Sequence, residues 1–198
     1  MKVRLVLASA SPRRRELLAQ LDVPFEVVAS DVPETPRPGE PPAAFARRAA
    51  RDKATAVARR CPDALVLAAD TVVVVDAAIL GKPRDRADAR RMLEALSGRT
   101  HEVLTAVALR AAGGHVEDVV VRSAVQFRAL AAHEIDAYVD SDEPYDKAGA
   151  YAIQGRAHHF IVQVQGSYTN VVGLPVDEVR ELLRQHLPAR AAMPHTVS

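Results

Sequence analysis

The chain has 198 residues, of which 48% are hydrophobic, and a formal net charge of +1 at pH 7. This length suits one domain with a substantial core, and the interspersed charges exclude the wide cationic face that nucleic-acid or membrane binding requires. The single cysteine, Cys61, excludes an internal disulfide. No apolar run approaches the length of a membrane span, and the first one is too short for a signal peptide, so we expect a cytoplasmic protein.

The chain begins with a predicted strand over residues 3–8 and a helix that starts at Pro12. Ser11 is well placed to cap this helix, and proline suits its first position. The arginines at 13–15 then lie at the positive end of the helix dipole, where each costs about 0.3–1 kcal/mol. An anion there reverses the sign of that cost and gains free backbone N–H groups and the hydroxyl of Ser9. We therefore predict a phosphate site; the alternative is that the arginines extend into solvent.

A second strand is expected over residues 25–29, and a proline-rich extended loop over 32–42 follows it. Glu34 is the one candidate functional carboxylate of this loop, although the segment favours a side chain that is only solvated. The alanines and arginines of 42–60 predict a strong helix. Lys53 lies on that helix, and the segment alone favours a surface lysine.

Asp70 is the strongest single signal for a functional site. It lies between two apolar runs of strand length, 65–69 and 72–75, which are typical of strands buried on both faces. A carboxylate there loses several kcal/mol on desolvation unless a cation, a metal or hydrogen-bond donors share its site. Asp70 therefore lies at the mouth of the sheet or has a dedicated partner; the alternative is a turn that points it at solvent. A hairpin turn at 76–78 would bring Lys82 close to it, which favours the partner.

The second half of the chain is predicted to be mostly scaffold. Helices are expected over 85–98, 133–140 and around 179–183, and strands over 101–109, 116–130 and 160–164. The small residues and glycines of 147–155 permit close backbone approach to a ligand. One domain is expected over residues 1–187, and residues 188–198 are expected to form a disordered tail.

These residues suit the hydrolysis of a phosphoanhydride. The chain combines a phosphate cradle, lysines that act as point charges in an arginine-rich background, and a semi-buried aspartate. Such chemistry needs cations that neutralise the phosphate chain and a carboxylate that holds a divalent metal or activates water. His158 and His159 lack the further ligands of a zinc site, and Cys61 has no histidine partner for thiol chemistry.

Five motifs, in this order along the chain, resemble those of the Maf nucleoside triphosphate pyrophosphatases. They are SASPRR at 9–14, ADTV at 69–72, GKP at 81–83, KAG with IQG at 147–149 and 153–155, and GSY with VGLP at 166–168 and 172–175. The resemblance covers about residues 3–185. It implies an α/β fold in which a mixed β-sheet with flanking helices forms two lobes around a central cleft. It also implies cleavage of nucleoside triphosphates to the monophosphate and pyrophosphate with a divalent cation, Mg²⁺ or Mn²⁺, and often a homodimer.

The resemblance also implies roles for individual residues. The catalytic residues would be Asp70, as proton acceptor, and Lys82. The phosphates would be held by Ser9, Arg14 and Lys53 together with Lys82. The metal would be held by Asp70, with Glu34 a weaker candidate because its loop only loosely follows the family's acidic pattern. The residues that look like the branch acting on dTTP and UTP are Arg13, Thr71 and Gln154.

Gln154 gives this substrate choice a physical basis. Its amide presents a donor beside an acceptor, which matches the N3–H and carbonyl edge shared by uracil and thymine. The sequence therefore predicts hydrolysis of dTTP and UTP, which removes excess or non-canonical nucleotides. Two alternatives stay open: a nucleotide sensor that regulates cell division without significant turnover, and a pyrophosphatase acting on 7-methyl-GTP.

Overall fold

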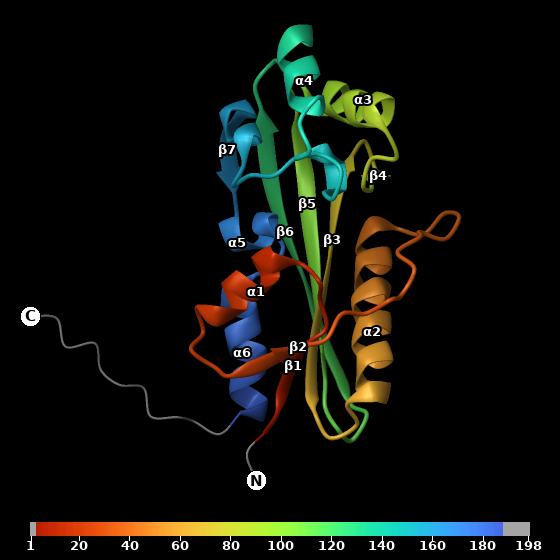
Figure 1. Cartoon of the computed structure of the whole chain (residues 1–198), viewed down its shortest axis with the longest axis vertical. Helices are drawn as coiled ribbons and strands as arrows, with labels where there is room; N and C mark the ends of the chain where they lie inside the picture. The colour runs from red at the N-terminus through yellow and green to blue at the C-terminus, as the bar shows by residue number, and fades with distance from the viewer. Residues whose placement is uncertain (1–2, 188–198) are drawn as a thin grey trace, which may run out of the picture.

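The computed structural model describes residues 3–187, so the tail expected at 188–198 lies outside the described residues. A seven-stranded sheet forms the centre and helices flank it (Figure 1). The strands are β1 (Leu5–Leu7), β2 (Phe25–Val27), β3 (Leu65–Val75), β4 (Ala78–Leu80), β5 (Thr100–Arg110), β6 (Val116–Phe127) and β7 (Ile161–Gln165). The helices are α1 (Pro12–Ala19), α2 (Pro42–Arg60), α3 (Arg86–Leu96), α4 (Ala132–Val139), α5 (Tyr168–Val172) and α6 (Val176–His186), with short 3₁₀ segments at Ala148–Ala150 and Arg156–Phe160.

The sheet is mixed. Its order is β2-β1-β3-β5-β6-β7, with β4 paired to β3 outside this path. β1 runs parallel to β2 and β3, and the remaining pairs are antiparallel. This arrangement confirms the predicted α/β fold class of a mixed sheet with flanking helices. The extent of the domain over 1–187 stays a prediction.

Strand β3 has two short partners on the same side. β1 pairs with its first part, Leu65–Leu67, and β4 pairs with its last part, Val73–Val75. Within the described chain, residues 68–72 therefore have no strand partner on that side, whereas β5 pairs with them on the other. We call residues 68–72 the fork of the sheet.

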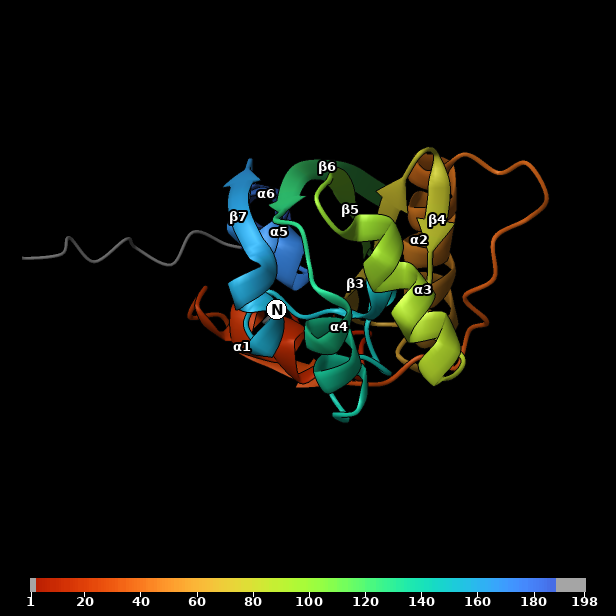
Figure 2. The same cartoon turned by 90° about the horizontal axis from the view of Figure 1, so that it is seen from above.

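The alternation of side chains along β3 divides the core between its two faces. Even-numbered residues from Val66 to Val74 pack against α2. Odd-numbered residues pack against α1 and α6 at one end of the sheet and against α3 and α4 at the other. Figure 2 shows α3 and α4 over this second end of the strands. Helices α1 and α6 cover one end of the long strands, and α3 and α4 cover the other. These two groups correspond to the two predicted lobes, and the fork lies between them.

Asp70 lies inside one continuous strand, so the prediction of two strands that flank it is wrong. It pairs with Ala106 of β5 at the middle of β3. The predicted hairpin turn is confirmed, because Asp76 and Ala77 join β3 to β4 with φ of 49° and 63°. The predicted cap is confirmed as well, since the Ser11 hydroxyl accepts a hydrogen bond from the N–H of Arg14 at 3.5 Å.

No helix within residues 3–187 combines the length and apolarity needed to cross a membrane.

Candidate active site

A cleft of about 150 Å³ opens at the fork. Residues from both lobes line it. The polar residues of its lining are Ser11, Arg13, Arg14, Glu34, Lys53, Asp70, Thr71, Lys82, Asp146, Lys147, Tyr151 and Gln154. Cations and carboxylates from six separate parts of the chain therefore meet where the sheet lacks a strand.

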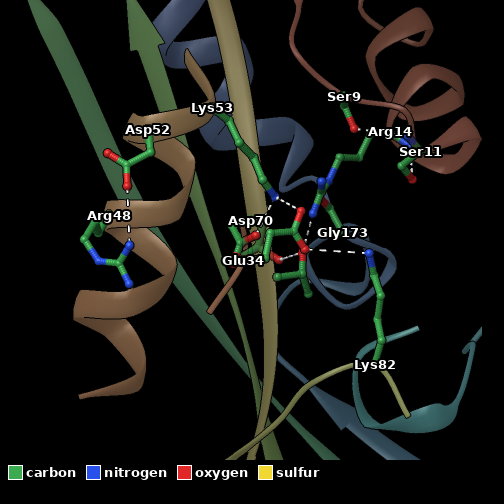
Figure 3. Close-up of polar contacts among 12 residues, drawn as sticks. Ser9, Ser11, Arg14, Glu34, Arg48, Asp52, Lys53, Asp70, Lys82 and Gly173 are labelled. Atoms are coloured by element: carbon green, nitrogen blue, oxygen red, sulfur yellow. Dashed lines mark hydrogen bonds and ion pairs between the residues drawn. The ribbon is translucent and has the colours of Figure 1, made fainter. Parts of the chain in front are cut away.

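Asp70, Lys53 and Glu34 form an ionic cluster in this cleft (Figure 3). Lys53 Nζ lies 2.6 Å from Asp70 Oδ1 and 2.6 Å from Glu34 Oε1. Lys53 and Asp70 are each only 4% exposed. Each charge has therefore lost most of its hydration, and attraction to the other charge offsets that loss. The dedicated partner of Asp70 is thus Lys53, while Lys82 Nζ approaches Glu34 Oε2 at 3.6 Å.

The buried face of α2 explains how Lys53 reaches Asp70. That face consists largely of alanines, such as Ala46, Ala49 and Ala50, and small side chains let a helix lie close to the sheet. Asp70 is an even-numbered residue of β3, so its side chain lies on the face of the sheet that α2 covers. The lysine therefore meets the carboxylate directly beneath the helix.

Glu34 is ionised despite its partial burial. Burial alone would raise the pKa of Glu34, but the charges of Lys53, Lys82 and Arg14 outweigh it and hold that pKa below its usual value. Glu34 and Asp70 thus present carboxylates to the same ammonium group.

These carboxylates fit a divalent cation only in part. Carboxylate oxygens suit Mg²⁺ and Mn²⁺, which proteins hold through about one or two carboxylates plus substrate phosphates. In the described part of the chain, no group of three or more His, Cys, Asp or Glu residues could hold a metal. Asp70 and Glu34 therefore suit such an ion together with phosphate oxygens from a ligand.

Arg14 forms the opposite wall of the cleft. Its Nε donates to the carbonyl of Gly173 at 2.9 Å, and its Nη2 donates to Thr71 Oγ1 at 3.0 Å. Burial lowers the pKa of Arg14, and the charges of Asp70 and Glu34 oppose this change. Both hydrogen bonds go to neutral oxygens, so no carboxylate is hydrogen-bonded to the guanidinium, and its remaining N–H groups can bind an anion.

A buried hydrogen-bond network supports Arg14 from behind. Thr71 Oγ1 lies 2.9 Å from Thr105 Oγ1, and Thr105 in turn donates to the carbonyl of Asn170 at 2.9 Å. The Asn170 side chain is fully buried, and it accepts from the N–H of Thr105 and donates to the carbonyl of Val103. Asn170 thus joins α5 to β5 at the level of the cleft.

Residues 4–186 match the family of Maf-like proteins. The chain belongs to this family. It is 57% identical over 191 residues to the dTTP/UTP pyrophosphatase of Myxococcus xanthus (strain DK1622), which covers 95% of this chain and 96% of that protein. It is 55% identical over 186 residues to the dTTP/UTP pyrophosphatase of Geobacter sulfurreducens, with 93% and 97% covered. The Ham1 protein of Staphylococcus aureus is similar in fold, with a TM-score of 0.52, 14% identity, and 92% and 98% covered.

The cleft brings together most of the residues predicted from the Maf motifs. Those in its lining are Arg13, Arg14, Glu34, Lys53, Asp70, Thr71, Lys82 and Gln154. Ser9 is buried behind the lining, and its hydroxyl accepts a hydrogen bond from the N–H of Ser11 at 3.2 Å. Ser9 therefore shapes the turn before α1, and its contact with phosphate stays a prediction.

Four expectations about single residues are wrong. Lys53 is buried, not on the surface, because α2 lies against the sheet at this position. Glu34 is bound by two lysines instead of being merely solvated. Lys82 was expected to pair with Asp70, but it contacts Glu34, because Lys53 already pairs with Asp70. Arg15 is exposed and is absent from the cleft lining, since each helical residue turns by about 100° from the one before it.

Sequence reasoning missed Thr105 and undervalued Asn170. Thr105 is a polar residue inside the buried apolar run of β5, and Asn170 is the only asparagine in the chain. Either feature could have indicated a buried polar network, because such groups require partners.

Proposed function

We propose that this Maf-family protein is a nucleoside triphosphate pyrophosphatase that hydrolyses dTTP and UTP to the monophosphate and pyrophosphate. The observation that carries the proposal is the Arg14 guanidinium, which has only neutral partners and borders the same cleft as Asp70 and Lys53. A phosphate chain would supply an anion that accepts hydrogen bonds from the guanidinium directly. The names of the two relatives support the choice of dTTP and UTP among nucleotides.

The roles of the ionic residues follow from this placement. Arg14 and Lys82 neutralise the phosphate chain from opposite sides of the cleft. Asp70 accepts the proton of a water molecule whose oxygen bonds to the α-phosphorus. The α–β bridging P–O bond then breaks, and pyrophosphate leaves with the bridging oxygen. Lys53 holds Asp70 Oδ1 in place for this step.

A divalent cation fits the proposal as a cofactor. Oxygens of Asp70 and Glu34 would hold Mg²⁺ or Mn²⁺ together with the phosphates, and the ion would supply further neutralisation of their charge. Removal of divalent ions with a chelator should then abolish pyrophosphate release, and either ion should restore it. A cytoplasmic location and a homodimer stay predictions.

Recognition of the base is assigned to the rim of the cleft. The exposed amide of Gln154 would pair with the edge of uracil or thymine. Arg13 lines the same cleft, and its Nη2 lies 3.9 Å from Asp146 Oδ2. The Thr71 hydroxyl contacts Arg14 and Thr105, so we assign it an indirect part in placing the substrate.

The experiment that tests this function measures pyrophosphate release from a panel of triphosphates with Mg²⁺ or Mn²⁺. We expect the highest kcat/KM for UTP and dTTP, with the monophosphate as the other product. Faster cleavage of GTP or 7-methyl-GTP would refute the substrate assignment. Tight binding of triphosphate without release of pyrophosphate would instead indicate a sensor.

Arg14→Ala tests the observation behind the proposal. Loss of a charge-assisted hydrogen bond costs about 1.5–3 kcal/mol, so calorimetry should show triphosphate affinity falling by roughly 10- to 100-fold. Arg15→Ala is the matched control, because it removes the same charge from the exposed side of the same helix turn. Equal affinities for the two variants would contradict the phosphate role of Arg14.

A further inference from the structure

Glu143 lies in the turn after α4, outside the ionic cluster of the cleft. Its Oε1 accepts a hydrogen bond from the hydroxyl of Tyr138 at 2.9 Å, and its Oε2 accepts one from the backbone N–H of Arg156 at 3.0 Å. The Tyr138 hydroxyl also accepts the backbone N–H of Ala152 at 3.4 Å. One carboxylate thus holds the backbone on both sides of Gln154.

Gly155 makes this close approach possible. A Cβ on Gly155 would lie 2.0 Å from Glu143 Oε1, so a side chain there would displace the carboxylate. The backbone of Gly155 is extended, with φ −102° and ψ −156°, which any residue can adopt. Glycine is therefore needed at this position for space, and not for backbone freedom. Lys147 Nζ strengthens the arrangement by donating to the carbonyl of Glu143 at 3.0 Å.

Gln154 is the exposed residue that this loop presents to the cleft. An exposed amide is directed by the backbone that carries it, and recognition of a base edge requires placement within about 0.5 Å. The hydrogen bonds between the turn that contains Glu143 and the segment that carries Gln154 involve only groups of the chain itself, so the carboxylate can hold the loop whether or not a ligand is bound.

We propose that Glu143 is a positioning residue that sets the base selectivity of the enzyme by holding the loop on which Gln154 lies. The inference rests on the proposed function, because it assumes that Gln154 contacts the base. Glu143 itself is not among the residues that line the cleft. Its two carboxylate oxygens accept two different donors, and a neutral amide offers only one acceptor oxygen.

The test compares Glu143→Gln and Tyr138→Phe with wild type and with Asp142→Asn. Asp142 is the exposed neighbour of Glu143, so its variant removes the same charge without touching the loop. For each protein, kcat/KM is measured for UTP and for CTP, whose base has the same size but a different hydrogen-bonding edge. Inhibition by inorganic triphosphate, which has no base, reports on the phosphate site.

We expect the UTP/CTP ratio of kcat/KM to fall by about tenfold or more in Glu143→Gln, because misplacement by 1 Å can cost about 100-fold. Tyr138→Phe should shift the ratio in the same direction by less, and Asp142→Asn should leave it unchanged. The inhibition constant of inorganic triphosphate should stay within about twofold of wild type in every variant. Thermal melts identify any variant that has lost its fold.

A wild-type UTP/CTP ratio in folded Glu143→Gln would overturn the inference, and so would an equal loss for both nucleotides and for inorganic triphosphate. The wild-type enzyme tests the proposed function separately. If it prefers another base, the dTTP/UTP assignment is wrong, and loss of that other preference in Glu143→Gln would still support the inference. A wild-type enzyme without any base preference would overturn both.

Discussion

Asp70 and Lys53 depend on each other for their place in the core. Removal of one partner from a buried ion pair typically costs about 3–5 kcal/mol, because the remaining charge keeps its desolvation penalty. Glu34 also contacts the Lys53 ammonium at 2.6 Å, so this lysine would keep a carboxylate if Asp70 lost its charge. The cluster can therefore tolerate a neutral residue at position 70 better than at position 53.

Asp70→Asn should abolish most turnover while the fold survives. The amide keeps the shape of the side chain but cannot accept the proton, and general-base help is worth about 10²–10⁴ in rate. Pyrophosphate release and a thermal melt measure the two effects. Asp52→Asn is the control. Asp52 lies on α2 next to Lys53, but its side chain pairs with Arg48 away from the cleft (Figure 3). Retention of more than about a tenth of wild-type turnover would contradict the assigned role.

Sequence patterns predicted the site residues whose signals are local. Arg14 follows a recognisable helix cap, and Asp70 interrupts an apolar run. The pairing of Asp70 with Lys53 was not predictable in this way, because it depends on how closely α2 lies against β3. Glu34 belongs to an irregular loop without periodicity, so nothing in its segment indicated that two lysines bind it.

At the scale of elements, the turn between β3 and β4 carries backbone strain. Asp76 and Ala77 both have positive φ, and alanine is an unfavourable residue for this conformation. The turn places β4 on β3 and thereby closes one end of the fork. The strain is therefore located in the element that borders the cleft, at an exposed position.

Ala77→Gly should raise the free energy of unfolding by about 1 kcal/mol, because the left-handed conformation costs an L-residue roughly that amount. Denaturation with urea measures the change. Ala78→Gly is the matched control one residue further on, inside β4, where glycine should lower stability. A loss of stability in Ala77→Gly comparable to that in Ala78→Gly would show that strain in the turn is negligible.

Sequence predicted most elements but failed at the middle of β3. A carboxylate between apolar runs indicates a break when only neighbouring residues are considered. The strand continues through Asp70 because β5 pairs with its backbone and the Lys53 ammonium neutralises its carboxylate. Both partners come from elsewhere in the chain, so the sequence around Asp70 could not reveal them.

At the scale of the whole molecule, His101 connects stability to pH. Its ring lies against Phe127 and Tyr151, and its Nε2 is 2.8 Å from the Tyr151 hydroxyl. Burial lowers the pKa of His101 to about 4, from 6.5. Between these values the unfolded chain binds more protons than the folded one, so the free energy of unfolding falls as the pH falls from about 6.5 to about 4.

Lowering the pH from 7 to 5 should therefore cost wild type about 2 kcal/mol more than it costs His101→Gln. The glutamine removes the titration and keeps a hydrogen-bonding group beside Tyr151. Urea denaturation at the two pH values gives the four free energies. His133→Gln, at an exposed site, should behave like wild type. The same pH dependence in all three proteins would exclude His101 as its cause.

The overall architecture followed from the family motifs more than from the periodicity of individual segments. Alternation and apolar runs predict strands and helices, but the strand order depends on contacts between distant segments. The fork is such a feature, because it needs β1 and β4 to share one side of β3. The motifs at Asp70 and Lys82 indicated that these segments meet, without showing how.

The fork also bears on self-association. An unpaired strand edge normally offers its N–H and C=O groups to a strand of another molecule, and edge-to-edge aggregation can follow. The unpaired edge of β3 is confined to residues 68–72 and is bounded at its ends by β1 and β4. An incoming strand longer than this gap would collide with both. The open edge of β3 beside Asp70 is thus too short to serve as a template on which a long strand of another copy could pair.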